Sequence, residues 1–150
     1  MNPNAVKWEG EIDGHVYRVM KLNGMEAANV FRRINAFVTP ILVAKLKGVA
    51  FDVGDMVAML SRELSRMPEE DYAYVQRTCL SSVVRVLEKG NPIPVMSRAG
   101  LQYADMSGYA ILELMNLSIR ENIMEEARNF SNALIAIMPS DLGATSEAST

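Results

Sequence analysis

The stretch Pro68–Lys89, PEEDYAYVQRTCLSSVVRVLEK, decides the expected fold, because it satisfies more rules of helix formation at once than any other segment. Pro68 suits the first helical position, and the three acidic residues that follow place negative charge where the helix dipole is positive. At the other end Lys89 supplies positive charge, Gly90 suits a left-handed cap, and Pro92 prevents continuation. The pattern predicts one helix about 33 Å long.

The apolar residues of this stretch share one face of the expected helix, at Tyr72, Val75, Cys79, Val83, Val86 and Leu87. A stripe of that length must be buried against other elements, so we interpret it as the central helix of the protein. The expected fold class is mainly α: a small helical domain of about five helices with an N-terminal β-hairpin. The domain would span residues 1–138, with the hairpin at 6–22 and a disordered tail at 139–150.

The composition supports one ordinary globular domain, since 150 residues with 49% hydrophobic and 22% charged residues can bury a real core. A net charge of −3 gives no general basic field, so we expect neither nucleic acid nor an anionic membrane as a partner. No uncharged apolar stretch approaches the roughly 18 residues that a membrane span needs. With one cysteine no internal disulfide is possible, which suits a reducing cytoplasm.

A β-hairpin is expected at 6–22, because Asp13-Gly14 is a strong two-residue turn signal between alternating runs. This turn predicts the register Ile12–His15, Gly10–Tyr17, Trp8–Val19 and Val6–Lys21. Glu9 then lies opposite Arg18 as a favourable charge pair. The edges of the hairpin would be open to strand addition, and self-association is expected there first.

Further helices are predicted on both sides of the central stretch. Asn23 can cap a helix that begins at Gly24, in which Pro40 should cause a break or kink. A second helix is expected from about Val53 to Arg66, behind a capping residue at Asp52.

The C-terminal third is expected to begin with a loop at 90–105, containing a short helical or extended piece. From Met106 onward apolar residues recur at intervals of three and four. This pattern fits one long helix or two helices with a joint near Asn122, and we expect two.

Residues with catalytic potential are isolated in the sequence. His15 has no partner motif, and Cys79 lies on the apolar stripe, where a buried and inert thiol is the expected state. Glycine-rich phosphate loops and metal-ligand spacings are absent from the sequence. We therefore expect no cofactor, no metal and no enzymatic activity.

Three features together resemble the tail assembly chaperones of long-tailed bacteriophages. The first is a short YRVMKL strand followed by the helix MEAANVFRRINAFVTPIL, and the second is an acidic-capped central helix. The third is a C-terminal helix with RNFSNALIAI, where Asn129-Phe130 is similar to an Asn-Phe element of that family. The likeness spans about 17–138, whereas the strand at 6–12 and the methionine-rich final helices depart from it.

The resemblance implies a non-enzymatic protein of the host cytoplasm. Such chaperones bind the tape-measure protein, whose long hydrophobic helices would otherwise aggregate, and help to bring tail tube subunits to it. They leave before the tail is finished. A monomer or small oligomer is expected before the client is met.

Spacing suggests a contact surface for the client, made of apolar residues from the first helix and from the C-terminal helical region. The proposed residues are Phe31, Ile34, Met115, Phe130, Leu134 and Met138. A groove with flexible methionines can accept many amphipathic helices. The same spacing also suits core positions, so the two interpretations stay open here.

A function of another class remains open as well: a structural self-assembling virion component, such as a neck or tail completion protein. In that case the open hairpin edge and the Trp8/Tyr17 face would build a ring. A stable, concentration-insensitive oligomer would favour this alternative.

Overall fold

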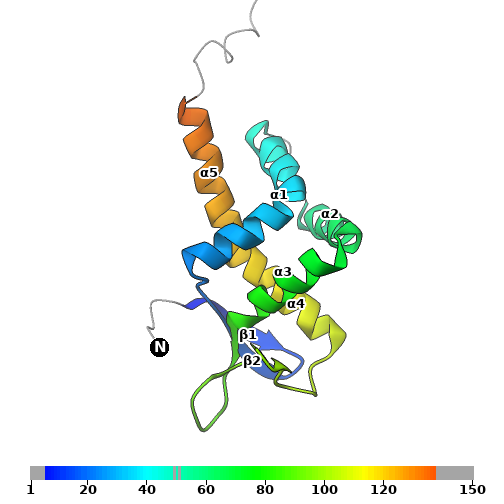
Figure 1. Cartoon of the computed structure of the whole chain (residues 1–150), viewed down its shortest axis with the longest axis vertical. Helices are drawn as coiled ribbons and strands as arrows, with labels where there is room; N and C mark the ends of the chain where they lie inside the picture. The colour runs from blue at the N-terminus through cyan, green and yellow to red at the C-terminus, as the bar shows by residue number, and fades with distance from the viewer. Residues whose placement is uncertain (1–5, 49, 51, 138–150) are drawn as a thin grey trace, which may run out of the picture.

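The computed structural model describes residues 6–48, 50 and 52–137. Within them the chain begins with a hairpin, continues with three helices, forms four short strands and ends in one long helical run (Figure 1). The elements are β1 (Val6–Ile12), β2 (His15–Met20), α1 (Gly24–Leu46), α2 (Val53–Arg66), α3 (Glu69–Ser81), β3 (Val83–Arg85), β4 (Ile93–Pro94), β5 (Met96–Ser97), β6 (Gly100–Leu101), α4 (Gly108–Ser118), a π-helical segment (Ile119–Ile123) and α5 (Met124–Ile137).

The fold class is mixed α/β, so the expectation of a mainly α domain with about five helices is wrong. The described residues form two antiparallel sheets, one of four strands in the order β1-β2-β3-β4 and one of β5 and β6. Their helices are α1, α2, α3 and a continuous run from α4 through the π segment into α5. The four-stranded sheet lies at one end of the molecule, and the helices extend from it (Figure 1).

The main error lies in the second half of the predicted central helix. Helix α3 ends at Ser81, and Val83–Arg85 instead forms an inner strand of the sheet. The Ser82 hydroxyl donates to the Cys79 carbonyl at 2.6 Å and thus helps to close the last helical turn. The β-branched pair Val83 and Val84 then suits a strand that is buried on both faces.

The hairpin prediction is confirmed in its turn and in most of its register. The pairs Ile12–His15, Gly10–Tyr17 and Trp8–Val19 form as expected. Val6 pairs with Met20 rather than Lys21, because a bulge lies between Val6 and Trp8. Only the β1 edge agrees with the expected open edges, since β3 pairs along the other side of β2.

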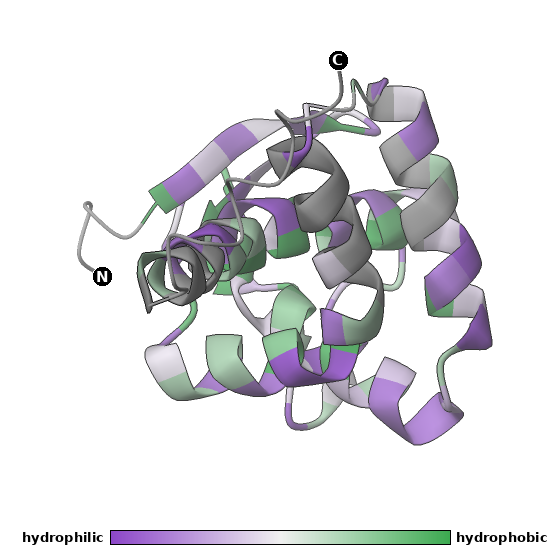
Figure 2. Ribbon diagram, turned by 90° about the horizontal axis from the view of Figure 1, so that it is seen from above, coloured by the Kyte–Doolittle hydropathy of each residue, from purple (hydrophilic) through white to green (hydrophobic). Residues whose placement is uncertain are grey.

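The core lies between the sheet and the helices. Tyr17 and Val19 of β2 are buried there together with residues from every long helix, among them Val30, Leu80 and Leu114. Hydrophilic and hydrophobic residues alternate along the helices, which is typical of elements that turn one face toward a core (Figure 2).

The caps of the first two helices are confirmed. Asn23 Oδ1 accepts from the Glu26 amide at 2.9 Å, and Asp52 accepts from the Gly54 amide at 3.0 Å. Helix α2 spans Val53–Arg66 as predicted. Helix α1 continues through Pro40 without a break but changes direction part-way along, where its colour passes from blue to cyan (Figure 1).

The π segment between α4 and α5 coincides with the predicted joint near Asn122. Instead of ending one helix and starting another, the chain widens for one turn and continues. The buried Asn122 side chain accepts from the Leu22 amide at 2.9 Å and donates to the Met20 carbonyl at 3.1 Å. One side chain therefore ties the end of strand β2 to the long helical run.

Candidate functional site

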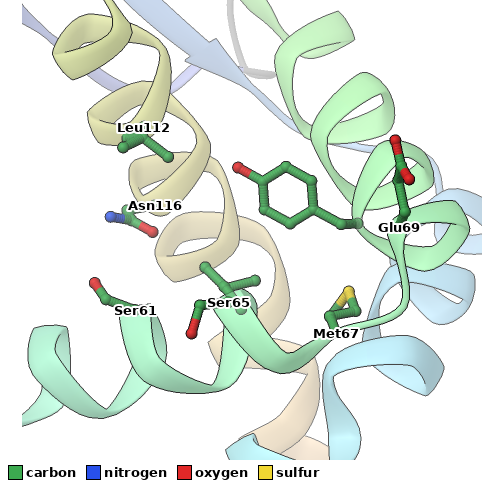
Figure 3. A pocket seen from close by; sticks show the side chains of 8 residues that line it. Ser61, Ser65, Met67, Glu69, Leu112 and Asn116 are labelled. Atoms are coloured by element: carbon green, nitrogen blue, oxygen red, sulfur yellow. The ribbon is translucent and has the colours of Figure 1, made fainter.

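A groove of about 470 Å³ lies where α2 ends, α3 begins and α4 passes them. Figure 3 shows Ser61 and Ser65 on α2 below Leu112 and Asn116 on α4, with Met67 in the turn after α2 and Glu69 at the start of α3. The residues that line the groove are Ser61, Leu64, Ser65, Met67, Glu69, Tyr72, Leu112 and Asn116.

The local sequence explains why these side chains meet. Ser61, Leu64 and Ser65 are three and four residues apart, so they share one face of α2. Leu112 and Asn116 stand in the same relation on α4. The groove thus combines apolar side chains with hydroxyl, amide and carboxylate groups.

Two leucines line the groove, and they differ in exposure: Leu112 has 48% of its surface exposed, whereas Leu64 is 8% exposed and also belongs to the core. A large apolar side chain exposed beside a hollow is a common feature of protein interaction sites. An amphipathic helix of a partner could place its apolar face there and leave its polar flanks against the serines and Glu69.

The contact residues predicted from spacing lie in or against the core wherever their side chains are described. Ile34 and Met115 are fully buried in the core, and Phe31 is partly buried against it. Phe130 and Leu134 lie on α5, but their side chains are outside the described part of the structure, as is the whole of Met138. The expected tail at 139–150 also falls outside the described residues. Of the three whose side chains the structure describes, Phe31, Ile34 and Met115, none lines the groove.

The single cysteine of the sequence lies in the described core. Cys79 is buried, and this burial raises the pKa of its thiol to about 12, even though a hydrogen bond with Ser118 lowers it. The thiol is therefore protonated at neutral pH and chemically inert, as expected. Within the described residues no group of three or more histidine, cysteine or acidic side chains is placed to hold a metal ion.

The most strongly coupled charges surround Arg85, whose side chain is buried in the sheet. Its guanidinium makes two hydrogen bonds of 2.9 Å with the Asp105 carboxylate and lies 4.6 Å from the centre of the Tyr103 ring. His15 Nε2 lies 3.3 Å from the same carboxylate. The buried Tyr103 hydroxyl has no hydrogen-bond partner among the described residues. The charged groups contact one another, so we interpret the cluster as a tie between strand β3 and the loop before α4.

The Arg85–Asp105 pair should make stability depend on pH. The hydrogen bonds from Arg85 lower the pKa of the Asp105 carboxyl, so the pair stabilises the fold above the ordinary carboxyl pKa of about 4. That contribution disappears as the pH falls through the lowered pKa of the folded state. We expect Asp105→Asn to be less stable than wild type at pH 7 and the difference to shrink below pH 4. Urea unfolding of both proteins across this pH range measures the difference in stability. A difference that does not change with pH would contradict the stabilising role of the Arg85–Asp105 pair.

Comparison with known proteins supplies the identity. Residues 13–124 match the family model described as phage tail assembly chaperone protein, TAC. The chain belongs to this family. The suspected resemblance to phage tail assembly chaperones is therefore confirmed, and a chaperone family indicates a non-enzymatic role with protein partners in tail assembly.

The family model matches only part of the described structure. It includes strand β2, helix α1 and every residue of the groove, and it begins after β1 and ends at Met124. The Asn129-Phe130 element quoted for the resemblance lies beyond it. No curated protein and no solved structure gives a significant match. No described helix is long and apolar enough to cross a membrane.

Proposed function

We propose that this chaperone binds the tape-measure protein in the host cytoplasm, keeps it soluble and helps to recruit tail tube subunits. The groove between α2, α3 and α4 is the observation that supports the proposal best. It lies wholly inside the range that the family model matches, and it pairs an exposed leucine with a polar rim.

The physical basis is the exchange of apolar surface. A tape-measure helix that exposes an apolar face in water lowers its free energy when that face is buried against Leu112, Met67 and Tyr72. The methionine can adapt to clients of varied sequence, because its side chain is flexible and polarisable. The polar rim keeps the empty groove compatible with solvent.

The residues proposed from spacing remain candidates for a second contact on the same client. Phe130 and Leu134 lie on α5, which extends away from the sheet beside the second half of α1 (Figure 1). Ile34 and Met115 could reach a client only after the helices separate, because both are fully buried. The groove therefore comes first in any mapping experiment.

The direct test is light scattering on the purified protein, alone and after co-expression with the tape-measure protein of the same genome. We expect the tape-measure protein to stay soluble in a defined complex with the chaperone. A chaperone that forms a large closed ring alone and ignores the tape-measure protein would instead support the structural virion component.

Substitution of Leu112 by aspartate should weaken this complex. The change places a charge in the apolar part of the groove, which a docked helix would have to desolvate, so we expect affinity to fall at least about tenfold. Leu101→Asp is the matched control, because Leu101 is also exposed and lies on β6 outside the groove. Pull-down with a tape-measure fragment measures the effect, and equal binding by both variants would exclude the groove as the contact.

A further inference from the structure

A second groove, of about 410 Å³, lies between strand β1 and helix α4. Tyr109, Glu113 and Leu117 line it from α4, where their spacing of four residues places them on one face of the helix. Trp8 and Glu11 line it from β1. None of its lining residues belongs to the first groove, so we treat this β1–α4 groove as a separate surface.

The β1–α4 groove combines buried apolar side chains with aromatic rings that reach the surface. Ile12 and Leu117 line it and belong to the core, whereas Tyr109 is 65% exposed and Trp8 is partly buried. The Trp8 ring lies against Gly10, whose lack of a side chain makes room for it. The groove thus presents two aromatic side chains beside an apolar base.

Carboxylates outnumber cations in the β1–α4 groove. Glu11, Asp13 and Glu113 line it together with a single basic residue, Arg120. The Arg120 guanidinium is already held by the Glu121 carboxylate through hydrogen bonds of 2.9 and 2.7 Å. The partner of Asp13 is neutral, a serine hydroxyl at 2.6 Å. Among the described residues none of the three lining carboxylates forms an ion pair, so the groove keeps an excess of negative charge.

We propose that the β1–α4 groove binds an arginine or lysine side chain of a partner polypeptide. The faces of indole and phenol rings attract a cation, and the carboxylates of Glu11 and Glu113 offer it charge-assisted hydrogen bonds. The methylene stem of the same side chain can cover the apolar base at Leu117. An anionic partner, such as a nucleic acid, would be repelled from this surface.

Two observations favour a polypeptide over a small free cation. The hollow is larger than one basic side chain, so residues next to the cation can also be buried in it. The family to which the chain belongs indicates protein partners. The proposal is independent of the function proposed above, because the two grooves share no lining residue.

Fluorescence provides a direct test, because Trp8 is the single tryptophan of the sequence and lines the groove. The purified full chain is titrated with a short arginine peptide with blocked ends, and separately with the same peptide carrying glutamine in place of arginine. We expect a saturable change in Trp8 emission with the arginine peptide, weaker binding at high salt, and no change with the glutamine peptide.

A pair of double variants separates the groove from net charge. Glu11→Gln with Glu113→Gln should weaken binding of the arginine peptide about tenfold or more. Glu70→Gln with Glu88→Gln removes the same charge at two exposed positions outside the groove and should bind like wild type. Tyr109→Ala, at an exposed position, should weaken binding about threefold or more through loss of the aromatic ring. Circular dichroism checks that each variant is folded.

An unchanged Trp8 emission in the presence of the arginine peptide would overturn the proposal, and so would an equal response to the glutamine peptide. Equal affinity of the two double variants would also overturn it. Spermidine that binds as tightly as the arginine peptide would overturn the assignment of the groove to a polypeptide. None of these results bears on the first groove, which Leu112→Asp tests separately.

Discussion

Replacing Tyr17 with alanine is expected to lower the free energy of unfolding by about 3–5 kcal/mol, the usual cost of removing a large buried aromatic side chain. Tyr17 is 1% exposed and is among the largest fully buried side chains of the described core. It stands in β2 between two neighbouring strands, opposite Gly10 on one side and Arg85 on the other. Urea unfolding followed by circular dichroism measures the change.

Tyr17→Phe is the matched control for this prediction. It keeps the ring and its packing and removes only the hydroxyl, so we expect a loss below about 1.5 kcal/mol. Because small domains are stable by only about 5–15 kcal/mol, the alanine variant should be partly unfolded at elevated temperature while the phenylalanine variant stays folded. Similar stability of the two variants would mean that the ring does not hold the sheet to the helices.

Asn122→Ala is expected to produce the second large loss of stability. The alanine leaves the Leu22 amide and the Met20 carbonyl without the partner that Asn122 gives them, at a cost of about 1–3 kcal/mol for each buried group left unpaired. The loss should also loosen the contact between the sheet and the helical run, so exchange of the Leu22 amide should accelerate.

Asn132→Ala serves as its control, because Asn132 is an exposed asparagine on the same helical run. We expect this variant to differ from wild type by less than about 0.5 kcal/mol. If both substitutions cost equally little, the two hydrogen bonds of Asn122 contribute nothing to the fold.

Much of the fold was predictable wherever local signals decided it. The Asp13-Gly14 turn set the hairpin register, and Asn23 and Asp52 marked the starts of α1 and α2. The strand β3 was not predictable in this way. The sequence around Val83 has the spacing of a helix and is followed by a lysine and a glycine that are typical of a helix end. Its strand conformation instead depends on pairing with β2, which lies more than 60 residues earlier in the chain.

The candidate site was less accessible from sequence than the fold. Spacing identifies the apolar side of each helix but does not separate buried positions from exposed ones, which is why Ile34 and Met115 qualified although both are core residues. The groove combines residues from α2, the turn at Met67 and α4, and their proximity follows only from tertiary packing. Leu112 belongs to the apolar repeat that the sequence shows from Met106 onward, but the repeat does not reveal that this residue is exposed.

Strand β3 is synthesised long after β2, the strand with which it pairs, and this order matters while the chain is on the ribosome. Val19 pairs with Val83, so 64 residues must be added after Val19 before its partner in β3 exists. At about 5–20 residues per second this takes roughly 3–13 s, during which the side of β2 that β3 will occupy is unpaired. An unpaired strand edge recruits other chains, so the nascent protein passes through a stage in which it is itself prone to aggregate.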